Sequence, residues 1–242
     1  MILDRLHHVT CVCSDAQQTT DFYRDQLGFT LAKKTVNFDD PHSYHLYFGD
    51  ESASPGSLMT FFEWPRAERG RLGRGTLESI GLVTPSVSVE TESEDPDGLR
   101  LRLYPGDRPA LHNVVAYGNP DLYAGLVDEN AGLTFGAPVD ETALLGAGIT
   151  HHIAWRAADD AEQAAWHDRL TAIGLRPTAQ QDRKYFRSIY FRMPDGLLLE
   201  IATDGPGFFV DEPPTRLGQL LALPPWLEPE RETLERELSP IT

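Results

Sequence analysis

Lysine is scarce in this chain, which has 242 residues but lysine only at Lys33, Lys34 and Lys184. Lysine and arginine together number 21 against 37 acidic residues, so the formal net charge is −16. Such a charge repels phosphate backbones and anionic bilayers, which argues against partners of either kind, nucleic acid or membrane. We therefore expect a small molecule as the binding partner.

Cysteine is also rare, since Cys11 and Cys13 are the only two. They lie two residues apart in a predicted strand, so both side chains share a face and a disulfide between them would be strained. We expect reduced thiols that pack in a core, which suits a cytoplasmic protein. No apolar stretch approaches the ~18 residues that cross a bilayer, and the N-terminus lacks the apolar centre of a signal peptide.

Two histidine pairs, His7-His8 and His151-His152, open two similar stretches of the chain. After each pair come an Asp-Ala dipeptide and a helix-like stretch that ends before a glycine. The chain has only eight histidines, so chance is a poor explanation for two adjacent pairs in matching surroundings. The chain therefore contains an internal repeat.

The hydrophobic pattern divides each repeat into a strand, a helix and three further strands. In the first repeat these elements cover residues 6–14, 15–27, 29–37, 43–49 and 57–63. In the last they cover 151–157, 160–172, about 175–179, 185–193 and 197–202, with the final hairpin turning at Pro194-Asp195-Gly196.

The middle of the chain repeats only fragments of this β-α-β-β-β unit. Residues 96–99, Pro-Asp-Gly-Leu, match the final hairpin, while 111–114, Leu-His-Asn-Val, match the opening and lead into a helix-like stretch over 121–130. We therefore predict an α+β protein of repeated modules with a shortened middle region. The expected parts are a complete module over 1–84, two partial modules over 85–149, a complete module over 150–211, and a tail with a short helix over 212–242.

One histidine of each pair and one glutamate can be combined into a metal site. Successive side chains of a strand face opposite ways, so only one histidine of each pair points into a cavity. The third unit has Asn113 in the place of His8 and His152, and the first unit has Thr60 in the place of Glu200. A site of two imidazoles and one carboxylate can therefore be assembled once.

Such a site, His8, His152 and Glu200, is a facial triad that leaves coordination positions open and suits Fe(II) or Mn(II). Glu200 is the strongest clue, because it lies in an apolar strand where an uncompensated carboxylate would cost several kcal/mol. A buried arginine partner is the alternative for Glu200, and ordinary core or surface positions are the alternative for each histidine alone. An open metal site indicates catalysis.

Tyr190 and Arg183 are the polar residues that we expect nearest this site. Tyr190 should lie on the strand beside Glu200, where a phenol could donate a hydrogen bond or a proton. Arg183 could hold an anionic oxygen of a substrate. The alternatives are an amphipathic core tyrosine and a solvated loop arginine.

Three more residues belong to the expected surroundings of the metal. Thr10 shares the face of His8 and could line the pocket, while His7 and His151 should face away as packing residues or as outer hydrogen-bond partners. His45 is a poor ligand candidate, since a fourth protein ligand would close a position that a substrate needs. Nucleophile arrangements and glycine-rich phosphate loops have no recognisable context here.

Five segments together resemble the vicinal oxygen chelate superfamily, and within it the ring-cleaving branch that includes hydroquinone dioxygenases. The segments are residues 6–10, 33–40, 44–50, 185–192 and 199–204. The resemblance covers about residues 1–84 and 148–240. It implies open, cupped mixed β-sheets and a ferrous ion held by His8, His152 and Glu200. The family's outer and substrate-contacting residues match Thr10, His7, His151, Arg183 and Tyr190.

The resemblance also implies an activity, the extradiol-type cleavage of a hydroquinone- or catechol-like aromatic diol by O2. The partners would be a small aromatic substrate and O2, with a homo-oligomer as an option. The chain departs from relatives of this branch in length, because they usually carry four complete modules. The alternatives are a glyoxalase-like metal-dependent lyase or isomerase, which would ordinarily use a fourth protein ligand, and a non-catalytic small-molecule-binding protein of the same fold.

Overall fold

A computed structural model describes all 242 residues of the chain, which form two β-sheets and a few helices. The strands are β1 (Leu6–Cys13), β2 (Thr30–Asn37), β3 (Asp40–Gly49), β4 (Leu58–Glu63), β5 (Leu77–Thr84), β6 (Thr91–Glu94), β7 (Arg100–Pro105), β8 (Ala110–Ala116), β9 (Leu133–Phe135), β10 (Thr150–Ala157), β11 (Gln181–Asp182), β12 (Arg187–Arg192) and β13 (Leu198–Thr203). The α-helices are α1 (Ala16–Thr20), α2 (Asp160–Ala172) and α3 (Arg231–Glu237). A π-helical segment, η1 (Asp21–Gln26), continues α1, and short 3-10 helices are η2 (Pro120–Leu122), η3 (Phe208–Val210), η4 (Pro214–Arg216) and η5 (Glu228–Glu230).

The larger sheet joins the first and last modules, which lie far apart in the sequence. Its order is β11-β12-β13-β10-β1-β4-β3-β2, so that β1 and β10 form an antiparallel pair at the centre. Each module repeats the same pairing, with β1 parallel to β4 and β10 parallel to β13. The sequence repeat therefore becomes a pseudo-two-fold arrangement around the central pair.

The two modules also begin and end their helices alike. Asp15 and Asp159 cap α1 and α2 by accepting hydrogen bonds from the backbone N–H three residues later. Gly28 and Gly174 follow the helices with φ of 73° and 87°, a left-handed conformation that glycine adopts without steric cost. These local signals explain why the same segments of both repeats are helical.

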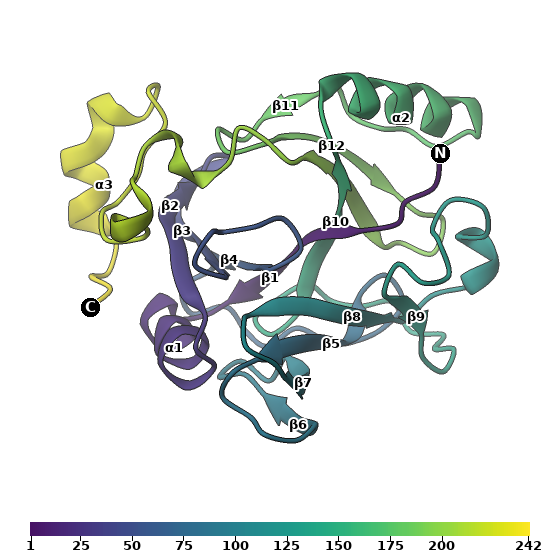
Figure 1. Cartoon of the computed structure of the whole chain (residues 1–242), viewed down its shortest axis with the longest axis horizontal. Coiled ribbons are helices and arrows are strands. Elements are labelled where there is room, and N and C mark those ends of the chain that lie inside the picture. Colours follow the sequence, from purple (N-terminus) through teal and green to yellow (C-terminus); the bar gives the residue numbers. More distant parts are fainter.

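The smaller sheet is built mainly from the middle of the chain, in the order β6-β7-β5-β8-β9. β7 and β8 flank β5 on either side. The hairpin predicted at Pro96-Asp97-Gly98 joins β6 and β7, whose strands pair antiparallel. Figure 1 shows this sheet packed beside the central strands β1 and β10, with α2 and α3 at opposite ends of the molecule.

The core lies between the two sheets, and a single cluster of 44 buried apolar residues spans both. Strand β1 shows the principle, because Val9 and Cys11 belong to this cluster while His8 and Thr10 face the other way. Both cysteines are buried and unpaired, as predicted. None of the helices combines the length and the apolar character that a membrane span requires.

Two predicted elements are wrong. The strand expected near 175–179 is absent, because Pro177 has no N–H to donate and the hydroxyl of Thr178 takes the backbone N–H of Tyr190. The helix-like stretch 121–130 forms only the turn η2 and open loop. There Gly125 has a left-handed φ of 71°, and Val127 pairs with Leu3 near the N-terminus.

Candidate metal centre and its cavity

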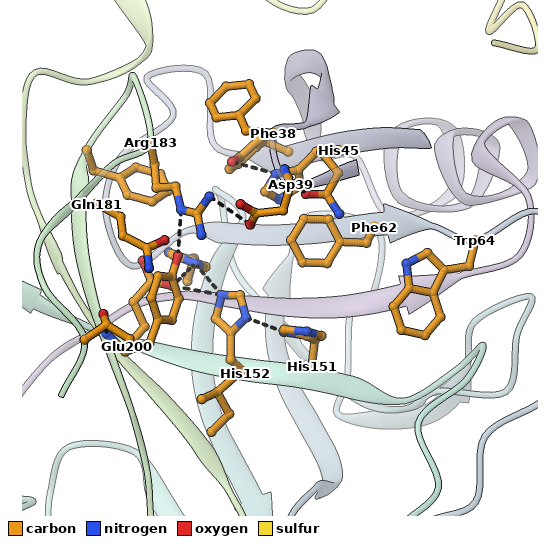
Figure 2. Close-up of a pocket in the computed structure, with 17 residues that line it drawn as sticks. Phe38, Asp39, His45, Phe62, Trp64, His151, His152, Gln181, Arg183 and Glu200 are labelled. Atoms are coloured by element: carbon orange, nitrogen blue, oxygen red, sulfur yellow. Dashed lines mark hydrogen bonds and ion pairs between the residues drawn. The ribbon is translucent and has the colours of Figure 1, made fainter. Parts of the chain in front are cut away.

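His8, His152 and Glu200 meet on the face of the larger sheet that points away from the main core. They come from β1, β10 and β13, three adjacent strands, and all three side chains are buried. Nε2 of His152 lies 2.8 Å from Oε2 of Glu200 and 3.2 Å from Nε2 of His8 (Figure 2). Nε2 of His8 lies 3.3 Å from the same carboxylate oxygen. No other group of histidine, cysteine or acidic side chains converges in this way.

These distances fit a divalent metal ion. Three donor atoms about 2.1 Å from one ion and at right angles to one another would be about 3.0 Å apart. The three observed separations, from 2.8 to 3.3 Å, lie on either side of that value. The donor set therefore has the spacing of a facial triad.

The carboxylate of Glu200 presents a free oxygen to this position. The hydroxyl of Ser188 donates to Oε1, whereas Oε2 is fully buried and accepts no hydrogen bond. Burial would raise the pKa of Glu200, but the imidazoles of His8 and His152 hold that pKa well below its ordinary value. An ionised, buried oxygen without a donor is a site for a cation.

The first histidine of each pair orients the second. Nδ1 of His7 lies 2.9 Å from Nδ1 of His8, and the corresponding distance between His151 and His152 is 2.8 Å. An imidazole that offers Nε2 to a metal carries its proton on Nδ1, so His8 and His152 would donate to their neighbours. His7 lies outside the cavity, as expected, whereas His151 lines it.

A cavity of about 320 Å³ opens in front of the three donor atoms, which is large enough for a single aromatic ring. Six of its 17 lining residues are phenylalanine, tyrosine or tryptophan, namely Phe38, Tyr47, Phe62, Trp64, Phe186 and Tyr190.

Arg183 connects the site with the cavity mouth. Its Nε donates to the hydroxyl of Tyr190 at 3.1 Å, and its Nη1 forms an ion pair with Asp39 at 3.0 Å (Figure 2). Tyr190 pairs with Glu200 across β12 and β13, and its ring lies edge-on to that of His152 at 5.7 Å between centroids. The structure therefore brings both predicted polar residues to the site, and adds Asp39 as an unpredicted partner.

Thr10 does not line the cavity. Its side chain lies on the same face as that of His8 but is fully buried, and its hydroxyl lies 2.7 Å from that of Thr60. His45 does line the cavity, but its Nε2 bonds to Thr60 rather than joining the other donor atoms.

Most of the site residues that could not be singled out from the sequence belong to the cavity wall. Tyr47 was detectable, since it follows the cavity residue His45 by two positions on β3 and so shares its face, whereas Phe62 follows the fully buried Thr60 on β4. Ser188 also had a signal, because it lies two residues before Tyr190 on one strand. Phe186, from the loop before β12, had none.

Known proteins are similar to this chain in sequence and in structure. The family model for the glyoxalase/bleomycin resistance protein/dioxygenase superfamily matches residues 5–201. The chain belongs to this superfamily. The predicted resemblance is thereby confirmed.

Full-length relatives in the superfamily are ring-cleaving dioxygenases by name. "Putative ring-cleaving dioxygenase MhqO" of Bacillus subtilis is 33% identical, with 97% of this chain and 96% of that protein covered. "Chlorohydroquinone/hydroquinone 1,2-dioxygenase" of Sphingobium indicum is 28% identical, with coverage of 98% and 96%. The first alignment extends over 298 positions, more than the length of this chain, so that relative has residues that are missing here.

Solved structures agree with the superfamily assignment. A crystal structure described as a "putative dioxygenase" from Bacillus subtilis superimposes with a TM-score of 0.91 at 31% identity, covering 100% of this chain and 98% of that one. Glyoxalase I from Zea mays gives a TM-score of 0.59 at 15% identity, with coverage of 83% and 92%, and shows the shared fold alone.

The equivalent strand pairings of the two halves of the larger sheet explain why three donors meet rather than four. Thr60 pairs with Thr10 in the first module as Glu200 pairs with Ala154 in the last, so Thr60 occupies the position equivalent to Glu200. A hydroxyl stands there in place of a carboxylate, and it is engaged with Thr10 and His45. The side of the metal position that faces the first module therefore has no protein carboxylate.

The lowered pKa values of three histidines near the site predict that the metal-free protein is sensitive to acid. Burial lowers the pKa of His7 and of His151 to about 3, and it also lowers the pKa of His152. In the unfolded chain these groups take up protons near pH 6.5, so the folded state should lose stability as pH falls from about 6.5 towards 3. Urea unfolding of the metal-free protein at pH 7, 6 and 5 should give a falling free energy of unfolding.

His7→Gln should reduce this slope, because one of the groups that stay neutral in the folded state is gone. His167→Gln changes a surface histidine and should leave the slope unchanged. Equal slopes in all three proteins would contradict the assignment of part of the acid sensitivity to His7.

Proposed function

We propose that this protein is an Fe(II)-dependent, extradiol-type ring-cleaving dioxygenase that acts on a hydroquinone- or catechol-like aromatic diol. His8, His152 and Glu200 would hold the ion, with Mn(II) as the other metal that suits the donor set. When bound, the ferrous ion supplies the redox chemistry through which O2 reacts with the diol. The observation that carries the proposal is a three-donor site, spaced for a facial triad, that opens into an aromatic-lined cavity.

The residues around the triad suit an aromatic diol. Phe62, Trp64 and Phe186 would enclose the ring and exclude bulk water. Arg183 and Tyr190 would hold an oxygen of the substrate that has lost its proton, because a guanidinium and a phenol both donate hydrogen bonds to an anion. The ion pair with Asp39 fixes the guanidinium in this orientation.

A glyoxalase-like isomerase is less well supported. Such an enzyme would ordinarily use a fourth protein ligand, and Thr60 stands where the pseudo-symmetry of the modules would provide one. A purely binding protein is also less well supported, since it has no need for an ionised glutamate buried between two imidazoles.

Oxygen uptake tests the proposal. The protein is loaded anaerobically with Fe(II), then given O2 and a panel containing hydroquinone, catechol and 4-methoxyphenol. We expect one O2 consumed per molecule of diol, both oxygen atoms of ¹⁸O2 in the ring-opened product, and no uptake with the monophenol ether. The Zn(II)-loaded protein, which lacks redox chemistry, should be inactive. Isomerisation of a hemithioacetal without O2 uptake would overturn the proposal in favour of the glyoxalase-like alternative.

A further inference from the structure

Four polar side chains form a hydrogen-bonded chain that leads from two fully buried threonines to the cavity. The hydroxyls of Thr10 and Thr60 are 2.7 Å apart, and that of Thr60 lies 3.0 Å from Nε2 of His45. Nδ1 of His45 lies 2.9 Å from the hydroxyl of Tyr47. Thr10 and Thr60 are fully buried, whereas His45 and Tyr47 line the cavity.

The buried end of this chain decides which way its protons point. The hydroxyl of Thr10 contacts only that of Thr60, so its proton has no other acceptor. If Thr10 donates to Thr60, then Thr60 donates to Nε2 of His45, whose Nδ1–H donates in turn to the oxygen of Tyr47. The reverse order would leave the proton of Thr10 buried without an acceptor, which costs about 1–3 kcal/mol. The proton of Tyr47 is therefore left to point into the cavity.

Tyr47 also stands in the position that mirrors Tyr190. It pairs with Thr60 across β3 and β4 as Tyr190 pairs with Glu200 across β12 and β13. The two modules thus place two phenols in the same cavity, one from each side. Burial raises the pKa of Tyr47 well above its ordinary value, so this phenol stays protonated.

Phe186 contacts both Tyr47 and the metal-site residue His8. Its ring lies 5.2 Å from that of His8 and 6.4 Å from that of Tyr47, between centroids. Tyr47 lies on β3, two strands from β1, so a group bound to it would be farther from the triad than one bound to Tyr190, which lies beside His152. This placement suits the second oxygen of a diol whose first oxygen lies beside the metal position.

We propose that Tyr47 is a further substrate-binding residue, a fixed hydrogen-bond donor to the negatively charged second oxygen of an aromatic diol. His45, Thr60 and Thr10 are positioning residues that hold the hydroxyl proton of Tyr47 in that direction. The inference rests on the proposed function, because it takes an aromatic diol as the ligand of this cavity. It adds a residue and a role that neither the repeat nor the metal triad requires.

Nitrohydroquinone is the probe, because its visible absorption changes as each phenolic oxygen loses its proton. Anaerobic, Fe(II)-loaded protein is titrated with it, and the pH midpoint for formation of the bound dianion is measured. Tyr47→Phe should raise this midpoint by at least about one unit, a tenfold effect, since it removes a hydrogen bond to a charged oxygen. Thr60→Val should raise it as well, because His45 could then accept the proton of Tyr47.

Tyr44→Phe is the matched control. Tyr44 lies on the same strand, and its hydroxyl donates to the backbone of Ser239 outside the cavity, so its midpoint should equal that of the wild type. Iron is quantified in each protein so that a lost metal is not taken for a lost donor. If Tyr47→Phe folds poorly, Thr60→Val alone decides.

Midpoints for Tyr47→Phe and Thr60→Val that equal the Tyr44→Phe value would overturn the inference and leave the proposed function standing. A wild-type protein that holds iron but does not bind the probe would overturn both. A raised midpoint in Tyr47→Phe, together with an unchanged one in Tyr44→Phe, would support the assignment.

Discussion

Glu200→Ala is expected to lose the metal and with it the oxygen uptake. The variant removes the only carboxylate of the donor set, and with it the charge that draws a cation between His8 and His152. Loss of a mere supporting partner of a ligand typically costs 10–100-fold in affinity or activity. We therefore expect loss of more than about 100-fold here. Iron retained after anaerobic gel filtration should fall from one per chain to nearly none.

Glu200→Gln separates charge from shape in the same experiment. The amide can keep the contact with Ser188 but offers the metal a neutral oxygen, so it should bind iron weakly. Glu63→Gln is the control, since Glu63 is also buried but accepts a hydrogen bond from the N-cap region of α1, far from the triad. Iron binding by Glu200→Ala that equals that of Glu63→Gln would exclude Glu200 as a ligand.

The fold and the triad were predictable because both depend on local alternation within strands. Strand alternation makes His8 and Val9 face opposite ways, and likewise His152 and Ile153. The sequence repeat indicated that the second histidine of each pair belongs to the face that carries the site. The same alternation identified Tyr190 as the neighbour of Glu200, and the observed register confirms it. Alternation therefore brought His8, His152, Glu200 and Tyr190 together without coordinates, but it was wrong for Thr10, which does not line the cavity, and for His151, which does.

Other parts of the site depend on contacts between segments far apart in the chain. The Arg183–Asp39 ion pair joins two loops separated by most of the protein, and nothing near either residue indicates the other. The absence of the strand predicted near 175–179 has a similar origin. The backbone N–H of Tyr190 donates to the side-chain hydroxyl of Thr178 rather than to a backbone oxygen. Such substitutions of one hydrogen-bond partner for another leave the hydrophobic pattern unchanged, so the pattern cannot show them.

The pseudo-symmetry of the larger sheet explains why the two modules have different roles. Equivalent positions hold Thr60 and Glu200 on the inner strands, and Tyr47 and Tyr190 on the outer ones. The last module contributes the carboxylate and the Arg183–Tyr190 pair, while the first contributes a neutral chain of hydroxyls and an imidazole. One half of the cavity is thus arranged for a cation, and the other for hydrogen bonding to an organic ligand.

Lys33→Met is expected to lower the free energy of unfolding by about 3–5 kcal/mol, because it removes one partner of a buried ion cluster. The ammonium of Lys33 is fully buried on β2 and pairs with Asp211 and Glu212 of the tail-proximal loop. Without it, Glu212 remains buried with Oε1 already lacking a partner. The same cluster includes Lys184, next to Arg183, so the variant should also loosen the loop that carries Arg183.

Urea unfolding of the metal-free protein measures the loss of stability in Lys33→Met. The control is Lys34→Met, which changes a half-buried neighbouring lysine and should cost less than about 1 kcal/mol. Equal stabilities of the two variants would mean that the Lys33 cluster does not hold this loop against the first module.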